Sequence, residues 1–284
     1  MKLSKIFALL LALCLISSAA CAATFTDAHG NVIKLDDSLE AYAAVTLVGA
    51  DNAARQGETN LGDLWADALR WFAVSGEINA AFDEDDVKAG NDRIAVDADH
   101  VVALWNGGNL RADIAEGTFG AEALAEVLPF PNKVAVVYMT GAQLLETLEA
   151  ASQGLPYTAE TADACASLMQ VSGLTYTVDT TKAYDALEAY GDHWFTAGSV
   201  SRVRIDDVNS QPFDAEATYA VVTSNANFNG MDSSYVLKAA AEANEQSAVT
   251  IAVVRDVVFR FIAAELNHQV GEAYAAPQGR LTIL

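Results

Sequence analysis

The chain has 284 residues, 52% of them hydrophobic, and its 38 acidic residues outnumber its 16 basic residues to give a formal net charge of −22. A sequence of this length can bury one sizeable core, and its three cysteines are too few for a disulfide framework. The charge excludes nonspecific binding of nucleic acid, because such binding requires a basic face that neutralises phosphates.

Residues 1–20 are typical of an export signal. A basic start precedes an apolar run over residues 6–16, and small residues follow. The run is shorter than the ~20 residues that span a bilayer, so we expect no transmembrane segment in the mature chain. Cleavage before Cys21 would permit a lipid anchor there, but residues 18–20 lack the leucine that is usual at such sites. We therefore expect an exported protein, periplasmic or extracellular, with a membrane-anchored lipoprotein as the alternative.

Residues 21–44 are predicted to be an N-terminal extension. Polar and apolar residues alternate over 24–35 around the turn-forming residues 28–31, which is typical of a hairpin. The main domain is predicted over residues 45–284.

This domain is predicted to begin with a helix. Thr59 or Asn60 can cap it, and apolar side chains then recur at helical spacing. The acidic stretch 82–90 is expected to be a loop. The continuous apolar run 101–105 predicts a buried strand that leads into a glycine turn. The apolar positions of the helix are Leu61, Leu64, Trp65, Ala68, Leu69 and Phe72.

Further along, Thr118 is expected to cap a short helix that ends near Leu128, and residues 133–139 are expected to form a strand. Thr140 and Gln143 have the spacing of a capping box, in which each side chain binds the other residue's backbone amide. The helix that follows would turn Leu144, Leu145, Leu148 and Ala151 inward.

The second half mixes strands with one long helix. Strands are predicted over 171–178, 200–208, 219–223 and 280–284, and an amphipathic helix over 254–266. Residues 179–199 show no clear period and are interpreted as an insertion, whose aromatic side chains favour a local core over a site. Because helices and strands do not alternate strictly, we predict an α+β fold with a layered mixed β-sheet and flanking helices.

Six short segments resemble, in the same order, motifs of the C-terminal, substrate-binding domain of the 5'-nucleotidase family. The resemblance covers residues 45–284 and implies the fold of that domain. The family's separate N-terminal metallophosphoesterase domain, which holds two metals and performs the hydrolysis, has no counterpart here. One segment alone would be weak evidence, but six in order make accident improbable. The segments are 55–64, 106–111, 128–130, 170–174, 202–203 and 279–281.

The resemblance implies a role for each matching residue. Arg55 and Arg111 match arginines that hold the substrate's phosphate, and a guanidinium can bind phosphate through two parallel hydrogen bonds. In the glycine turn, Gly108 lets the backbone approach a ligand. The remaining matches are Asn106, which contacts the base, Phe130, which stacks on it, and Asp232, which accepts hydrogen bonds from the ribose hydroxyls.

The segment 225–233 departs from the family pattern. Its second stacking aromatic falls on Ala226, so one wall of the base clamp is lost. Phe228 would point to the same face only if the segment were extended, and Tyr235 or the aromatic insertion are the other replacements. Met231 and Ser233 replace glycines, so we expect the loop to follow a different path.

Catalysis by this chain alone has little support in the sequence. Metal-assisted hydrolysis needs a cluster of His, Asp and Asn ligands, whereas the four histidines are scattered. Asp27-x-His29-Gly30 imitates a metallophosphoesterase motif, but the companions of that motif are absent, and there is no Gly-x-Ser-x-Gly elbow. We therefore predict no catalytic residue, no metal ligand and no cofactor.

The sequence thus predicts an exported, stand-alone domain that binds a nucleotide, nucleoside or related phosphoester. A separate metallophosphoesterase chain would complete its role in nucleotide catabolism. The resemblance implies a hydrolase, but the purified chain is predicted to be inactive. One alternative is a non-catalytic interaction module of the cell envelope with a degenerate pocket, which Ala226 favours. The other is an independent hydrolase with an unrecognised site.

Overall fold

The computed structural model describes residues 24–26, 32–34 and 40–284 of the chain. The predicted export signal and Cys21 lie outside these residues. Strands β1 (Thr24–Thr26) and β2 (Val32–Lys34) pair antiparallel. Among the described residues, no helix combines the length and apolar character needed to cross a membrane.

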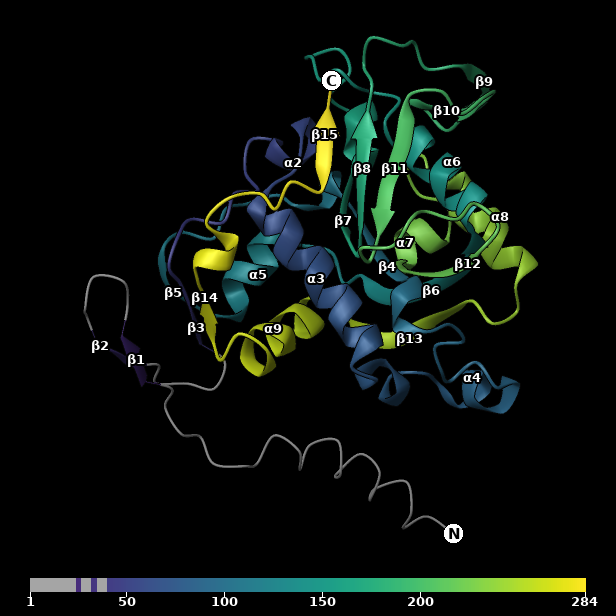
Figure 1. Ribbon diagram of the computed structural model, residues 1–284. Coiled ribbons are helices and arrows are strands. Elements are labelled where there is room, and N and C mark those ends of the chain that lie inside the picture. The colour runs from purple at the N-terminus through teal and green to yellow at the C-terminus, as the bar shows by residue number, and fades with distance from the viewer. Residues whose placement is uncertain (1–23, 27–31, 35–39) are drawn as a thin grey trace.

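A five-stranded mixed sheet forms the centre of the fold, in the order β13-β6-β12-β4-β7 (Figure 1). β12 pairs parallel with β4 and antiparallel with β6, and both outer pairs are antiparallel. All six positions of β4 are buried, as its continuous apolar run predicts. The strands are β4 (Val101–Asn106), β6 (Lys133–Thr140), β7 (Met169–Ser172), β12 (Thr218–Ser224) and β13 (Ala248–Val253).

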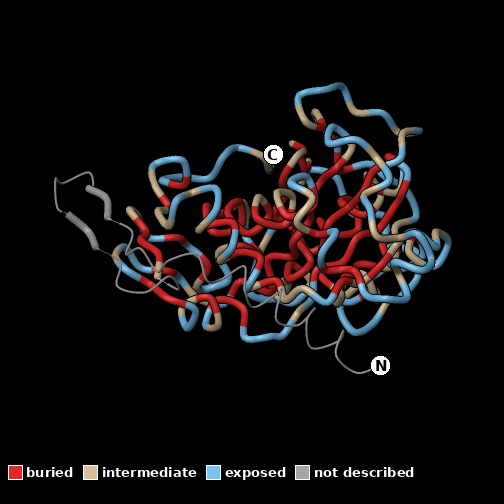
Figure 2. The backbone as a smooth tube through the Cα atoms, turned by 90° about the horizontal axis from the view of Figure 1, so that it is seen from below, coloured by how far each residue is buried: buried red, intermediate tan, exposed pale blue. Residues whose placement is uncertain are grey.

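Helices cover both faces of this sheet, because side chains alternate between two cores along its strands. On β4, Ala103 and Trp105 face the first core, and Val102 and Leu104 face the second. α3 (Asn60–Val74) and α9 (Val254–Ala264) bury their apolar stripes in the first core. α6 (Gly141–Ala151) and α8 (Tyr235–Ala243) do so in the second. Figure 2 shows buried backbone through the middle of the molecule, and the layered α+β prediction is confirmed.

Two of the three predicted helix caps follow local hydrogen-bonding rules. The Thr59 hydroxyl accepts a hydrogen bond from the amide of Gly62 at 3.0 Å and caps α3. At the start of α6, the Thr140 amide donates to Oε1 of Gln143 at 2.9 Å, which completes the predicted capping box. Contacts between residues three positions apart therefore determine where these two helices begin.

The predicted single strand over 171–178 is wrong. Gly173 adopts a φ of 80°, a left-handed conformation that interrupts the strand. β7 consequently ends at Ser172, and β8 (Leu174–Val178) joins a different sheet of order β11-β8-β15. Its other members are β11 (Val203–Val208) and β15 (Leu281–Ile283).

Two shorter predictions are also wrong. The stretch 82–90 contains α4 (Glu84–Ala89), because the Asp83 carboxylate accepts hydrogen bonds from the amides of Asp85 and Asp86 at 2.9 Å. Thr118 does not cap a helix. It lies in β5 (Gly117–Phe119), and α5 (Ala121–Val127) begins after Gly120.

The insertion over 179–199 contains a hairpin of β9 (Ala186–Tyr190) and β10 (Trp194–Ala197), at the upper right of Figure 1. A third small sheet has the order β14-β3-β5, with β3 (Ala41–Ala43) and β14 (Gln269–Val270). Two helices are short. α2 (Ala53–Gln56) contacts the turn that follows β4, and α7 (Asn225–Phe228) follows the end of β12. Short 3-10 turns cover Glu77–Ala80, Ala98–His100, Gly107–Asn109, Ala164–Ser167 and Glu272–Tyr274.

Candidate functional site

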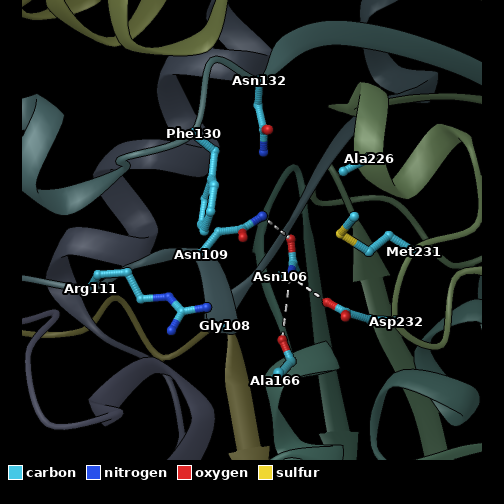
Figure 3. A pocket seen from close by; sticks show the side chains of 10 residues that line it. All are labelled: Asn106, Gly108, Asn109, Arg111, Phe130, Asn132, Ala166, Ala226, Met231 and Asp232. Carbon is cyan, nitrogen blue, oxygen red and sulfur yellow. Dashed lines mark hydrogen bonds between the residues drawn. The ribbon is translucent and has the colours of Figure 1, made fainter. Parts of the chain in front are cut away.

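A pocket of about 170 Å³ lies where β4 ends (Figure 3). Four segments that are distant in sequence meet there: the glycine turn after β4, the segment after α5, the Ala164–Ser167 turn and the segment around α7. Five of the seven predicted site residues line it: Asn106, Gly108, Arg111, Phe130 and Asp232. The other lining residues are Asn109, Asn132, Ala166, Ala226 and Met231.

The glycine turn needs its glycines because other backbone lies against it. A Cβ on Gly107 would lie 2.0 Å from the carbonyl oxygen of Ala54. A Cβ on Gly108 would lie 2.7 Å from the Cβ of Ala166 and 2.8 Å from its carbonyl oxygen. Gly108 therefore allows the turn to approach the Ala164–Ser167 segment, while its role in the approach to a ligand stays a prediction.

A chain of hydrogen bonds joins two of the loops across the pocket. Nδ2 of Asn109 donates to Oδ1 of Asn106 at 2.8 Å, and Nδ2 of Asn106 donates to Oδ2 of Asp232 at 2.8 Å and, over a longer 3.5 Å, to the carbonyl of Ala166. Asn106 is only 2% exposed. Its amide therefore orients the Asp232 carboxylate from a buried position.

Asp232 is held in an unusual environment. Its φ of 55° is left-handed, which favours a short polar residue. Burial raises the pKa of its carboxyl group, while the charges of Arg55 and Arg111 and the hydrogen bond from Asn106 act in the opposite direction. The carboxylate thus faces a positively charged side of the pocket.

Arg111 and Phe130 form one wall. The guanidinium carbon of Arg111 lies 5.9 Å from the centroid of the Phe130 ring. Phe130 is 42% exposed. The Arg111 amide donates to the carbonyl of Val127 at 2.9 Å, which fixes the glycine turn beside this segment. Burial, and then the nearby charge of Arg55, lower the pKa of Arg111. None of the described acidic side chains forms a salt bridge with Arg111.

Arg55 does not line the pocket. Its side chain is mostly buried, and its guanidinium donates to the carbonyl of Ala162 at 2.8 Å and lies 3.6 Å from a carboxylate oxygen of Asp163. Arg55 therefore holds the loop before the Ala164–Ser167 turn. It acts on the pocket through its charge, which reaches both Arg111 and Asp232.

The structure does not place Phe228 in the pocket. The segment is helical as α7, so residues 226 and 228 do not share a face as they would in a strand. Ala226 lines the pocket, whereas Phe228 and Tyr235 pack against the second core. The Tyr235 hydroxyl also donates to Oε1 of Glu146 at 2.9 Å.

Sequence reasoning missed four lining residues, one of which is Asn109, the hydrogen-bond donor to Asn106. Asn132 lies two residues beyond Phe130, and its side chain makes no hydrogen bond to the described part of the protein. Met231 was noted only as a replacement for a glycine, yet it is 56% exposed at the pocket, on the opposite side from Phe130 (Figure 3). Ala166 carries no chemical signal, and only the fold places it there.

Outside the pocket, the described histidines are dispersed, whereas Arg280 gathers two carboxylates, 3.8 Å from Asp63 and 2.8 Å from Asp67. His193 lies 3.9 Å from Asp163, and His100 lies 2.6 Å from Asp97. Within residues 40–284 and the two described N-terminal strands, no three His, Cys, Asp or Glu side chains gather as a metal site. Cys165 is buried as a free thiol, and burial raises its pKa.

Comparisons with known proteins place this geometry in context. The family profile of the 5'-nucleotidase C-terminal domain matches residues 40–239. The trifunctional nucleotide phosphoesterase protein YfkN of Bacillus subtilis (strain 168) is 31% identical over 136 residues, which are 48% of this chain and 8% of that protein.

Solved structures give the same result for the fold. The 5'-nucleotidase precursor of Thermus thermophilus aligns with a TM-score of 0.60 at 26% identity, over 99% of this chain and 43% of that one. The Haemophilus influenzae NAD nucleotidase aligns with a TM-score of 0.57 at 14% identity, over 92% of this chain and 48% of that one. This chain therefore spans less than half the length of each of these relatives. Since the family profile covers well over half of the chain, the protein belongs to the family of 5'-nucleotidase C-terminal domains.

Proposed function

We propose that the chain binds a nucleotide or nucleoside in the pocket at the end of β4. The observation that carries this proposal is the Phe130 side chain, which is 42% exposed at the pocket with the Arg111 guanidinium 5.9 Å from its ring centroid. An exposed aromatic face can stack on a base, and stacking contributes about 1–3 kcal/mol per base. A guanidinium without a carboxylate partner can bind a phosphate.

The polar side of the pocket suits the sugar. Asp232 is oriented by Asn106, and a fixed carboxylate can accept hydrogen bonds from two neighbouring hydroxyls. The volume of about 170 Å³ is smaller than the ~300–1,000 Å³ of pockets that enclose a whole small molecule. The base and ribose would thus be held here, while the phosphate extends past Arg111 and stays accessible.

An accessible phosphate suits a division of labour. We propose that a separate metallophosphoesterase chain supplies the metals and the hydrolysis, and that this chain is exported, with its export signal removed, to act with that enzyme in nucleotide catabolism. Lipid attachment at Cys21 is the less favoured variant. Radiolabelled palmitate incorporated into the wild type but not into Cys21→Ser would establish it, and an unlabelled wild type would leave plain export.

A second function is a non-catalytic interaction module of the cell envelope. Ala226 favours it, because a methyl group provides little surface for a base to contact opposite Phe130. In that case the exposed Phe130 and Met231 would contact a protein instead of a ligand.

Calorimetry on the mature chain with adenosine, AMP and a UDP-sugar separates the two. We expect saturable binding that Phe130→Ala and Arg111→Ala weaken, with the Arg111→Ala effect confined to the phosphorylated ligands. Arg204→Ala is the matched control, because that arginine is exposed and pairs locally with Asp206. If the folded wild type binds none of the three ligands, the interaction module becomes the better explanation.

Phosphate release tests the predicted lack of activity. We expect none from AMP with the purified chain, with or without added divalent metal. Release that persists at constant rate through repeated purification and is lost in Arg111→Ala would instead establish an independent hydrolase.

A further inference from the structure

The β9–β10 hairpin reaches two of the loops that form the pocket. One contact is made by Tyr190, whose hydroxyl donates a hydrogen bond to the carbonyl of Gly230 at 2.7 Å. The next two residues, Met231 and Asp232, line the pocket. Gly230 is buried with a φ of 87°, and a Cβ on it would overlap the Tyr190 hydroxyl. The tyrosine therefore lies directly against the backbone that presents Asp232.

The second contact comes from Trp194. Its indole nitrogen donates to the carbonyl of Ala164 at 3.1 Å, and the neighbouring His193 lies 3.9 Å from Asp163. Ala166, two residues beyond Ala164, lines the pocket on the side of Gly108. The same hairpin thus holds the backbone at two edges of one pocket.

The hairpin itself is anchored to helices of the second core. The Phe195 amide donates to Oε1 of Gln153 at 2.8 Å, and the Ala197 amide donates to the Tyr235 hydroxyl at 2.9 Å. The Tyr190 and Tyr235 rings contact each other with centroids 5.6 Å apart. Gln153 lies two residues after the end of α6, and Tyr235 begins α8. The hairpin is therefore fixed to both helices and can hold the two loops at a fixed spacing.

We propose that the β9–β10 hairpin is a positioning element that sets the spacing of the pocket walls, with Tyr190 and Trp194 as its positioning residues. The part of this proposal that concerns affinity rests on the proposed function. Neither residue lines the pocket, so both act through the loops they hold. The aromatic side chains that the sequence assigned to a local core are, in these two cases, hydrogen-bond donors to loop carbonyls.

Hydrogen exchange in the ligand-free protein tests the positioning without any ligand. The Met231 amide donates to the Ala226 carbonyl at 3.0 Å, and the Cys165 amide donates to the Thr161 carbonyl at 2.9 Å, so both amides are protected reporters. We expect Tyr190→Phe to speed exchange at Met231 by about 2- to 10-fold, the range for losing one neutral hydrogen bond. Trp194→Phe should do the same at Cys165.

Tyr184→Phe is the matched control. It removes the same kind of hydroxyl, which donates to the Phe195 carbonyl at 2.8 Å and touches neither pocket loop. The thermal midpoint of each variant is measured alongside, because a general loss of stability would speed exchange throughout the chain. Unchanged exchange at Met231 in Tyr190→Phe would overturn the proposal. Equal acceleration in Tyr184→Phe, whose lost hydrogen bond is to β10 itself, would refute Tyr190 as the residue that positions the loop.

Calorimetry with AMP adds the link to binding. Tyr190→Phe should reduce the affinity for AMP by about 2- to 10-fold at an unchanged thermal midpoint, whereas Tyr184→Phe should leave that affinity unchanged. If Tyr190→Phe speeds hydrogen exchange at Met231 but leaves the affinity for AMP unchanged, the hairpin does not set the ligand-binding geometry. The part of the proposal that concerns affinity is then refuted. If the wild type does not bind AMP, the proposed function fails for this ligand, while the exchange data still decide whether the hairpin positions the loops.

Discussion

Replacing Asn106 with alanine should destabilise the fold and disorganise the pocket together. The change removes two hydrogen bonds of 2.8 Å, one from Asn109 and one to Asp232. Each is worth about 1 kcal/mol net, and leaving the largely buried Asp232 carboxylate without its donor adds about 1–3 kcal/mol. We therefore expect the free energy of unfolding to fall by about 3–5 kcal/mol, out of the roughly 5–15 kcal/mol typical of a domain.

The loss should depend on pH in a defined direction. The folded-state pKa of Asp232 is already raised by burial, and removing the Asn106 donor raises it further. As pH rises from about 4, the unfolded state releases this proton before the folded state does, so stability decreases with pH. The difference between the Asn106→Ala variant and the wild type should accordingly be larger at pH ~8 than at pH ~5.

Urea unfolding at both pH values measures this effect. Asn132→Ala is the matched control, because it removes an amide from the same pocket that has no hydrogen-bond partner among the described residues. We expect the control to change stability by less than about 0.5 kcal/mol. If Asn106→Ala matched the control at both pH values, the assignment of Asn106 as the group that stabilises Asp232 would be refuted.

Three further outcomes are expected. Asp63 lies fully buried in the first turn of α3, 3.8 Å from the Arg280 guanidinium, and burial raises the pKa of its carboxyl group to about 8. This residue should therefore cost stability progressively from about pH 4 to about pH 8, and Asp63→Asn should reduce that decline in urea unfolding. Gly108→Ala should lower the free energy of unfolding by about 1–3 kcal/mol and reduce the affinity for AMP in calorimetry, because the added methyl group would overlap Ala166. An unchanged thermal midpoint would show that the turn can move away from Ala166. Thr140→Ala should cost about 1 kcal/mol through loss of the capping box without changing AMP affinity, and a change in that affinity would contradict the separation of α6 from the site.

Local patterns predicted the elements whose signals lie within a few residues. The start of α3 at Thr59 and the capping box of α6 depend on contacts three residues apart, and both were visible in the sequence. The break at Gly173 was not, because strand-forming residues continue on either side and only the φ of 80° separates the two strands. Likewise, the sequence did not single out Asp83 as a helix cap, because it stands in a run of acidic residues that is also typical of a solvated loop.

Most motif residues that the sequence grouped together also line one pocket, although their roles there stay predictions. Asn106, Arg111 and Asp232 do so, although the hydrogen bond between Asn106 and Asp232 joins residues that are 126 positions apart and could not be inferred from spacing. Arg55 shows the limit of this approach, since its guanidinium is directed to a loop carbonyl. Phe228 shows it again, because one turn of helix decides which of two neighbouring residues reaches the pocket.

The place of β12 in the sheet has a consequence for the timing of ligand capture. This strand inserts between β4 and β6, which precede it in the chain, and it carries at its end the segment with Asp232. A chain that is still being synthesised contains the glycine turn and Phe130 long before it contains the opposite wall. The pocket therefore forms only once β12 has inserted and the central sheet has closed.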